Sequence, residues 1–187
     1  MPSREIQVDR KSVVDLLASY NGWMNESVYA AARGLPTDEL TADRGAFFGS
    51  ILKTLNHLVI ADTIWLKRFA SHPAGYSALE PMLLMAMPDT ADLLRYSDLH
   101  SLSAQRSILD NLTTEWARSI KETDLDYVMN YTNSRGEMSN RVFFGLVLHF
   151  FNHQTHHRGQ ITTLLSQAGV DVGVTDLLAL VPEISGA

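Results

Sequence analysis

Residues 142–160 read VFFGLVLHFFNHQTHHRGQ, and this apolar run with embedded histidines decides the predicted fold. Residues three and four positions apart share one face of a helix. At about 100° per residue, the segment therefore carries one continuous inward stripe. The stripe consists of Leu146, Phe150, His153, His157, Gln160 and Leu164. We expect the helix to cover residues 140–167 and to stop at Ala168-Gly169, because glycine is favoured just past a helix end.

Three further segments show apolar residues at helical spacing. They are expected at residues 10–32, 46–70 and 102–123. Asp9 is a candidate N-cap for the first helix, and Ser101 or Ser103 for the third. The second is apolar around most of its circumference, which predicts heavy burial. Four long helices without a convincing central sheet predict an all-α four-helix bundle with long crossover connections, formed as one domain over residues 1–187.

The two longest connections and the tail carry signals of their own. Residues 72–100 contain three prolines and a methionine-rich piece. A structureless loop of that length is uncommon, so a short helix is expected there. In residues 125–139, apolar and polar residues alternate ahead of a glycine turn, which indicates a β-hairpin. The aliphatic tail after Gly169 is expected to pack back on the protein, because so much apolar surface would otherwise stay in water.

Composition narrows the class of protein. The chain has 187 residues, a formal net charge of -6 and no cysteine. The negative charge argues against nonspecific binding to nucleic acid, which needs a basic surface. The lack of cysteine excludes disulfides, thiolate ligands and a cysteine nucleophile, and it fits a reducing compartment. No stretch is long and apolar enough to cross a bilayer, and residues 1–5 lack the apolar core of a signal peptide. A cytoplasmic protein is therefore expected.

The histidines suggest a metal site. His153 and His157 occupy positions expected to face the core, and His57 lies in the apolar run of another predicted helix. Burying a polar group without a partner costs roughly 1–3 kcal/mol. A shared metal ion would satisfy both core histidines at once, and a facing helix would supply the third ligand. Three protein ligands leave one coordination position open, which is typical of a reactive site. The alternative is that these histidines are buried and neutral, with ordinary hydrogen-bond partners.

The residue types around the histidines narrow the choice of metal and reaction. Imidazole suits zinc, nickel, copper or iron(II), and we expect zinc first and nickel second. Carboxylates are nearly absent from the predicted inner faces of the second and fourth helices, which argues against a di-iron site. Calcium and magnesium prefer oxygen ligands. Gln154 stands where the zinc protease motif would carry glutamate, so peptide hydrolysis by that mechanism is disfavoured.

For several other polar and aromatic residues the sequence predicts only a general location or partner. Asp62 is expected to be a solvated charge or a partner of Arg158, which itself is either a surface side chain or a partner of a ligand histidine. His72 and His100 are expected to be ordinary surface residues. Candidates for the hydrogen bond that a ligand histidine makes through its other ring nitrogen are Asn56, Asn152 and Gln160. The residues expected to be core aromatics rather than substrate platforms are Trp23, Trp65 and Trp116, and Trp23 is a candidate for both roles.

Several stretches resemble one known family. Residues 149–161, HFFNHQTHHRGQI, are similar to the signature last helix of the DinB/YfiT-like superfamily of metal-binding four-helix bundles. Residues 49–65, GSILKTLNHLVIADTIW, resemble the second helix of that family. Residues 20–25, YNGWMN, resemble its first helix, and residues 131–136 resemble the segment before the last helix. These matches occur in the expected order and together cover most of the chain.

The resemblance implies metal ligands at His57, His153 and His157, and often a homodimer. Relatives in the wider superfamily include S-transferases and isomerases that use mycothiol or bacillithiol, while many members have no assigned reaction. We therefore expect a metal-dependent enzyme, of S-transferase or hydrolase type, that activates a small thiol or water for attack on a small electrophile. The alternative is a noncatalytic, metal-stabilised dimeric bundle that acts as a stress-response or interaction module. Nucleic acid and membranes are not expected partners.

Overall fold

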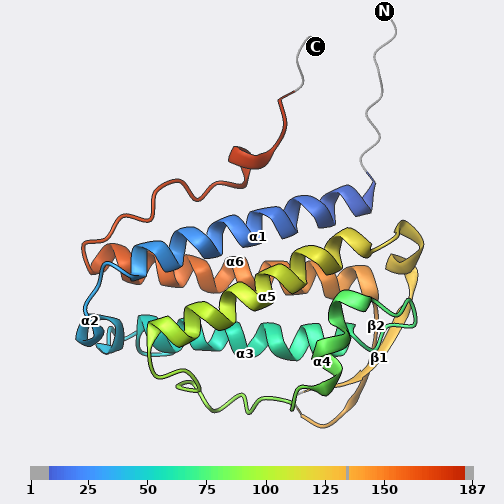
Figure 1. The fold of residues 1–187 in the computed structure, drawn as a ribbon, viewed down its shortest axis with the longest axis horizontal. Helices are drawn as coiled ribbons and strands as arrows, with labels where there is room; N and C mark the ends of the chain where they lie inside the picture. Colours follow the sequence, from blue (N-terminus) through green and yellow to red (C-terminus); the bar gives the residue numbers. More distant parts are fainter. Residues whose placement is uncertain (1–8, 134, 184–187) are drawn as a thin grey trace, which may run out of the picture.

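Four long helices form the body of the protein, as seen in a computed structural model that describes residues 9–133 and 135–183 (Figure 1). They are α1 (Arg10–Ala32), α3 (Ile51–Phe69), α5 (Leu99–Ser119) and α6 (Phe143–Gln167). α1 and α3 each pack against both α5 and α6. α1 and α6 run in one direction and α3 and α5 in the other, so the connection from α3 to α5 must return along the whole bundle (Figure 1). The predicted all-α four-helix bundle with a long crossover is confirmed.

Side-chain caps fix where two of the helices begin. Asp9 caps α1 as predicted, and its carboxylate accepts a hydrogen bond from the backbone N–H of Ser12 at 2.7 Å. α5 is capped by Asp98, whose carboxylate accepts from the N–H of Ser101 at 2.8 Å. The prediction that Ser101 or Ser103 caps this helix is wrong. Aspartate is as good an N-cap residue as serine, and Asp98 precedes both serines, so the helix begins earlier.

The second long helix begins later than predicted. Gly45 and Gly49 have positive φ angles of 67° and 82°, which glycine adopts without steric cost. They form a turn ahead of Ser50, whose hydroxyl accepts a backbone N–H of the first turn of α3 at 3.2 Å. The helix therefore starts at Ile51, and the preceding residues, including Phe48, form a loop beside it.

Short helices and a hairpin occupy the segments between and after the long helices. Such elements were predicted for residues 72–100 and 125–139. The short helices are α2 (Thr37–Thr41), η1 (Ser77–Leu79), α4 (Glu80–Leu84), η2 (Glu122–Asp126) and η3 (Leu177–Leu180). η1 and α4 confirm the short helix expected between residues 72 and 100. β1 (Val128–Thr132) and β2 (Met138–Val142) pair antiparallel and confirm the hairpin. The turn residue Ser134 lies outside the described residues. α6 starts after β2, at Phe143, because the hairpin takes up the residues before it.

The tail after Gly169 packs on the bundle only in part. Tyr20 of α1 donates its hydroxyl to the carbonyl oxygen of Thr175 at 2.7 Å. The aliphatic residues that contact the core, as predicted, are Val170, Val172, Leu177 and Leu180. Those that remain exposed, against the prediction, are Val174, Leu178 and Val181.

A helix that crosses a bilayer needs about 20 consecutive, predominantly apolar residues. Within residues 9–133 and 135–183, none of the helices combines the necessary length and apolar character. Residues 1–5, for which no signal peptide is predicted, lie outside the described part of the chain. The single domain over residues 1–187 stays a prediction.

The middle of the bundle contains buried charges. Arg106 of α5 is 3% exposed and donates to the carboxylate of Asp62 of α3, which is 1% exposed, at 2.5 Å. A second carboxylate, Asp110, lies 3.0 Å from the same guanidinium. Burial raises the pKa of Asp62, and the charge of Arg106 opposes that rise. The prediction that Asp62 is solvated or paired with Arg158 is therefore wrong, because its partner comes from a third helix.

Arg158 is also buried, so the prediction of a surface or metal-site side chain is wrong. Its guanidinium donates to Asn21 and, at 3.3 Å, to the side-chain oxygen of Asn25, both on α1. It also lies 3.4 Å from the side-chain oxygen of Gln154, one turn earlier on α6. Asn25 in turn donates to Asp110 at 2.8 Å, which joins this group to the Arg106 cluster. The buried polar network therefore connects all four long helices.

His72 is buried, which corrects the prediction that it lies on the surface; His100 is exposed as predicted. The ring of His72 packs against Phe143, with centroids 4.5 Å apart, and against Tyr76. Its Nδ1 accepts a hydrogen bond from the N–H of Ala74 at 3.1 Å. Burial lowers the pKa of His72 from its usual value of 6.5. The folded protein therefore holds this ring neutral where the unfolded chain would protonate it.

A His72→Gln variant should lose stability less steeply than the natural protein on acidification. The contribution of a neutral His72 is fully present above its unfolded pKa of 6.5 and is lost as the pH falls towards the lowered folded value. Urea unfolding at a series of pH values between about 7 and 5 measures this slope. His100→Gln, at an exposed position, is the matched control and should keep the natural slope. Equal slopes in all three proteins would contradict the prediction.

Candidate metal centre

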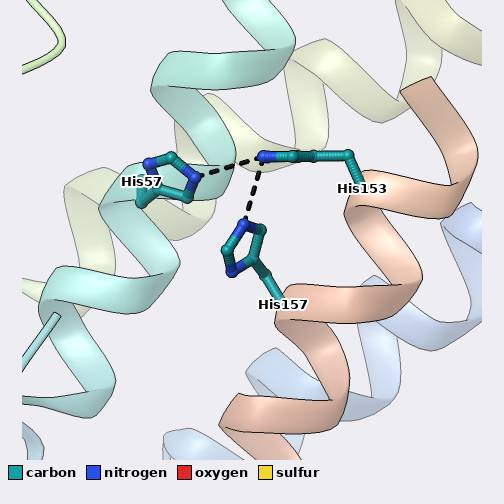
Figure 2. A group of neighbouring side chains, drawn as sticks. All are labelled: His57, His153 and His157. Carbon is teal, nitrogen blue, oxygen red and sulfur yellow. Dashed lines mark hydrogen bonds between the residues drawn. The ribbon is translucent and has the colours of Figure 1, made fainter. Parts of the chain in front are cut away.

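Three histidine rings meet where α3 and α6 run side by side. His57 lies near the start of α3, and His153 and His157 lie one turn apart on α6. Figure 2 shows the three rings pointing towards one another from the two helices. The Nε2 atom of His153 is 3.2 Å from Nε2 of His57 and 3.1 Å from Nε2 of His157. The nearest ligand atoms of the three residues all lie within 4.8 Å of one another.

The spacing and protonation of these nitrogens fit a metal ion. Two nitrogens bound at about 2.0–2.1 Å to one tetrahedral ion are about 3.3 Å apart, close to the observed separations. Burial, and to a smaller extent the charge of His157, lower the pKa of His57 to about 4. Burial and the other histidines lower the pKa of His153 to about 3. The rings are therefore neutral near pH 7, which is the form of histidine that binds metals.

Gln160 fixes the orientation of one ring. Its side-chain oxygen lies 2.8 Å from Nδ1 of His157. Since an amide oxygen only accepts, Nδ1 carries the proton and Nε2 presents its lone pair to the other two rings. Gln160 is thus the one of the three candidates that makes this hydrogen bond. Asn56 instead bonds the backbone of Leu52 and Tyr96, and Asn152 is exposed.

Phe48 covers one side of the triad. Its ring stacks on His57, with centroids 4.1 Å apart and an interplanar angle of 25°, and lies 5.4 Å from the ring of His157. The adjacent Phe47 is 85% exposed. Phe48 was not among the predicted site residues, although the glycines at 45 and 49 mark the turn that presents it. The apolar ring keeps water away from one side of the His57 and His157 rings.

Two other histidines lie beside the triad without belonging to it. The ring of His149 is 6.0 Å from that of His153, and the ring of His156 is 4.8 Å from that of His157. Both side chains are exposed. Among the residues that the structure describes, His57, His153 and His157 form the one group of three potential ligands that can reach a common ion. Three histidines this close together could bind a metal ion.

The triad occurs in a chain that matches one family along most of its length. The model of the DinB family matches residues 8–183. Protein DinB of Bacillus subtilis (strain 168) is 25% identical over 160 residues, which cover 86% of this chain and 88% of that protein. No solved structure matches significantly. Because the family match extends over far more than half of the chain, the protein belongs to the DinB family.

Proposed function

We propose that the protein binds one divalent transition metal ion through His57, His153 and His157 and uses it to activate a small thiol or water for attack on a small electrophile. Zinc is the preferred ion and nickel the next. When bound, such an ion acts as a Lewis acid that lowers the pKa of a coordinated water or thiol. The observation that carries the proposal is the convergence of three neutral imidazole nitrogens at 3.1 and 3.2 Å.

The side chains around the triad support this chemistry. The three ligand groups are uncharged, so they leave the full positive charge of an ion available to acidify a bound molecule. Gln160 holds His157 in the tautomer that presents Nε2, and Phe48 excludes water from one side. The chain has no cysteine, so the sulfur of a transfer reaction must come from a second molecule. In that reaction a sulfur–carbon bond forms, the leaving group departs with its electron pair, and the thiol proton passes to solvent.

A thiol-conjugation assay tests the proposal. Zinc-loaded and nickel-loaded protein are mixed with 1-chloro-2,4-dinitrobenzene and, in turn, bacillithiol, mycothiol, glutathione or water alone. We expect at least one thiol to react faster than without protein, and the acceleration to disappear in His153→Ala. His156→Ala, an exposed histidine on the same helix, is the matched control and should keep the rate. Background rates for the natural protein with every nucleophile would contradict an enzymatic role of this type.

A noncatalytic role is the second candidate, and one observation favours it. The triad joins His57 of α3 to His153 of α6, so a bound ion would link two helices of the folded bundle. We propose that this module would act as a cytoplasmic homodimer in stress response or partner binding. It predicts that chelation lowers the melting temperature although no reaction is accelerated. An unchanged melting temperature, with loss of the metal verified, would exclude metal stabilisation.

Replacing Gln160 by alanine should weaken zinc binding by roughly 10- to 100-fold, the usual effect of removing the partner of a ligand histidine. The physical reason is that His157 would lose the acceptor that fixes its tautomer and ring orientation. Competition with a chromophoric chelator measures the affinity. Gln167→Ala, at the exposed end of α6, is the matched control. Equal affinities for the two variants would show that the hydrogen bond does not support the site.

A further inference from the structure

A pocket of about 360 Å³ lies next to the triad, between α3, α6 and the hairpin. Its lining residues are Trp65, Tyr131, Arg141, Val142, Gly145, Leu146 and His149. His149 comes one helical turn before His153, whereas Phe48 contacts His157, one turn after it. The pocket and Phe48 therefore lie at opposite ends of the triad along α6. The larger cavity near Leu35 and His100 contains no residue of α6 and no triad histidine among its described lining residues.

The walls of this pocket are aromatic. The ring of Trp65 lies 5.1 Å from that of His149 and 5.6 Å from that of Tyr131, both at steep angles. Trp65 is only half-buried, in contrast to the fully buried Trp116. The predicted core position therefore accounts for only part of its surroundings, because the ring also lines the pocket. Apolar and aromatic walls with few polar groups are typical of sites for small molecules. Flat apolar compounds gain most from such rings.

The charge at the rim of the pocket is positive. Arg141 is the one charged side chain among the described residues of the lining, apart from the titratable His149. The guanidinium of Arg68 lies 4.7 Å from the centre of the Trp65 ring and 4.9 Å from that of Tyr131. Burial lowers the pKa of Arg68, so this cation is incompletely solvated. An anionic group on a ligand would find the guanidinium group of Arg141 and no described carboxylate in the lining. Arg68, which is not itself a lining residue, adds positive charge beside the Trp65 and Tyr131 rings.

We propose that this pocket holds the electrophilic substrate of the reaction, and that the substrate is a flat aromatic or conjugated compound carrying a carboxylate. The aromatic body lies against Trp65 and Tyr131, and the carboxylate faces Arg141. The location one helical turn from His153 places such a compound beside the triad. The claim that the bound compound reacts rests on the proposed function. Binding of this class of compound to the pocket can be measured without any metal.

Binding of 2-naphthoate to protein freed of metal with EDTA tests the compound class. Isothermal titration with 2-naphthoate and with uncharged 2-naphthylmethanol separates the aromatic from the charge contribution. We expect 2-naphthoate to bind more tightly than 2-naphthylmethanol. Arg141→Gln should lower the affinity for 2-naphthoate by about fivefold and leave the affinity for 2-naphthylmethanol unchanged. No binding of either probe, or equal binding of both to the natural protein, would overturn the inference.

A second variant tests the location. A Cβ atom added at Gly145 would meet no atom within 4 Å, and Gly145 lines the pocket, so Gly145→Leu places apolar volume in the pocket and replaces a poor helix former. We expect it to weaken 2-naphthoate by at least about tenfold, without loss of thermal stability. Gly159→Leu, an exposed helical glycine with equally free space outside the pocket, is the matched control. Equal affinity of the two leucine variants would show that the probe binds elsewhere.

Paramagnetic relaxation relates the pocket to the triad. Protein loaded with cobalt(II) should broaden the proton resonances of bound 2-naphthoate, and zinc-loaded protein should not. If the protein takes up no metal, the proposed function fails, while tight binding by metal-free protein still supports the pocket. If metal binds and the naphthoate resonances stay sharp under cobalt(II), the pocket is not beside the ion and the inference fails alone.

Discussion

A His153→Ala variant should lose zinc binding almost completely, with an affinity more than ~100-fold lower than that of the natural protein. Loss of a direct ligand must exceed the 10- to 100-fold effect of losing a supporting hydrogen bond. His153 is the decisive position, because its Nε2 is within 3.2 Å of the corresponding atoms of both other rings. Elemental analysis after dialysis and a chelator competition measure the loss.

The control for that experiment is His156→Ala, which removes an exposed imidazole from the same helix. It should retain the natural metal content, and a loss equal to that of His153→Ala would contradict the assigned ligand set. Thermal unfolding gives a second readout. An ion that binds only the folded state at 100 times its dissociation constant stabilises it by about 2.7 kcal/mol. Chelation should therefore lower the melting temperature of the natural protein and of His156→Ala, but not that of His153→Ala.

An Arg106→Met variant should be less stable by about 3–5 kcal/mol, the usual cost of removing one partner of a buried ion pair. The carboxylate of Asp62 would remain buried without its cation, and Asp110 would lose the guanidinium 3.0 Å away. Urea denaturation at pH 7 measures the difference. Arg118→Met, at an exposed position on the same helix, is the matched control and should change stability by less than ~1 kcal/mol.

The effect of Arg106→Met should also depend on pH. Burial raises the pKa of Asp62, and the guanidinium opposes this rise, so the variant raises that pKa further. Below the raised value, Asp62 protonates in the folded state and the cost of burying its charge disappears. The stability difference between natural and variant protein should therefore shrink as the pH falls from 7 towards 5. A difference that is constant over this range would show that the buried carboxylate is not its cause.

The sequence was sufficient to predict the four long helices and the convergence of the histidines. The periodic apolar residues of α1 predict its observed range, and the aspartate at position 9 is its cap. His57 lies 96 positions from His153, and it was predicted as the third ligand because it lies in the apolar run of a second helix. The resemblance to the family implied the same residue. The hairpin before α6 also followed from a short alternating pattern and a glycine turn.

The rotation of α6 and the pairing of buried charges could not be predicted. The inward stripe is correct for Leu146, Phe150 and Leu164, but His153 and Gln160 lie at its edge. Gln154 and Arg158 take the inner positions instead, because amides on α1 satisfy the guanidinium there. Helical periodicity assigns polar residues to the outside and contains no information about partners on other helices. The same limit explains why the pairing of Asp62 with Arg106 was missed.

The placement of the triad on the flank of the bundle has a consequence for how an ion would come and go. His157 is 8% exposed, and His57 and His153 are half-buried residues, so solvent reaches the edge of the cluster while the core stays closed. Exchange of an ion would then require only local side-chain motion, which is far faster than unfolding of a domain. Occupancy would consequently follow the surrounding supply of free metal throughout the lifetime of the protein, instead of being decided once when the chain folds.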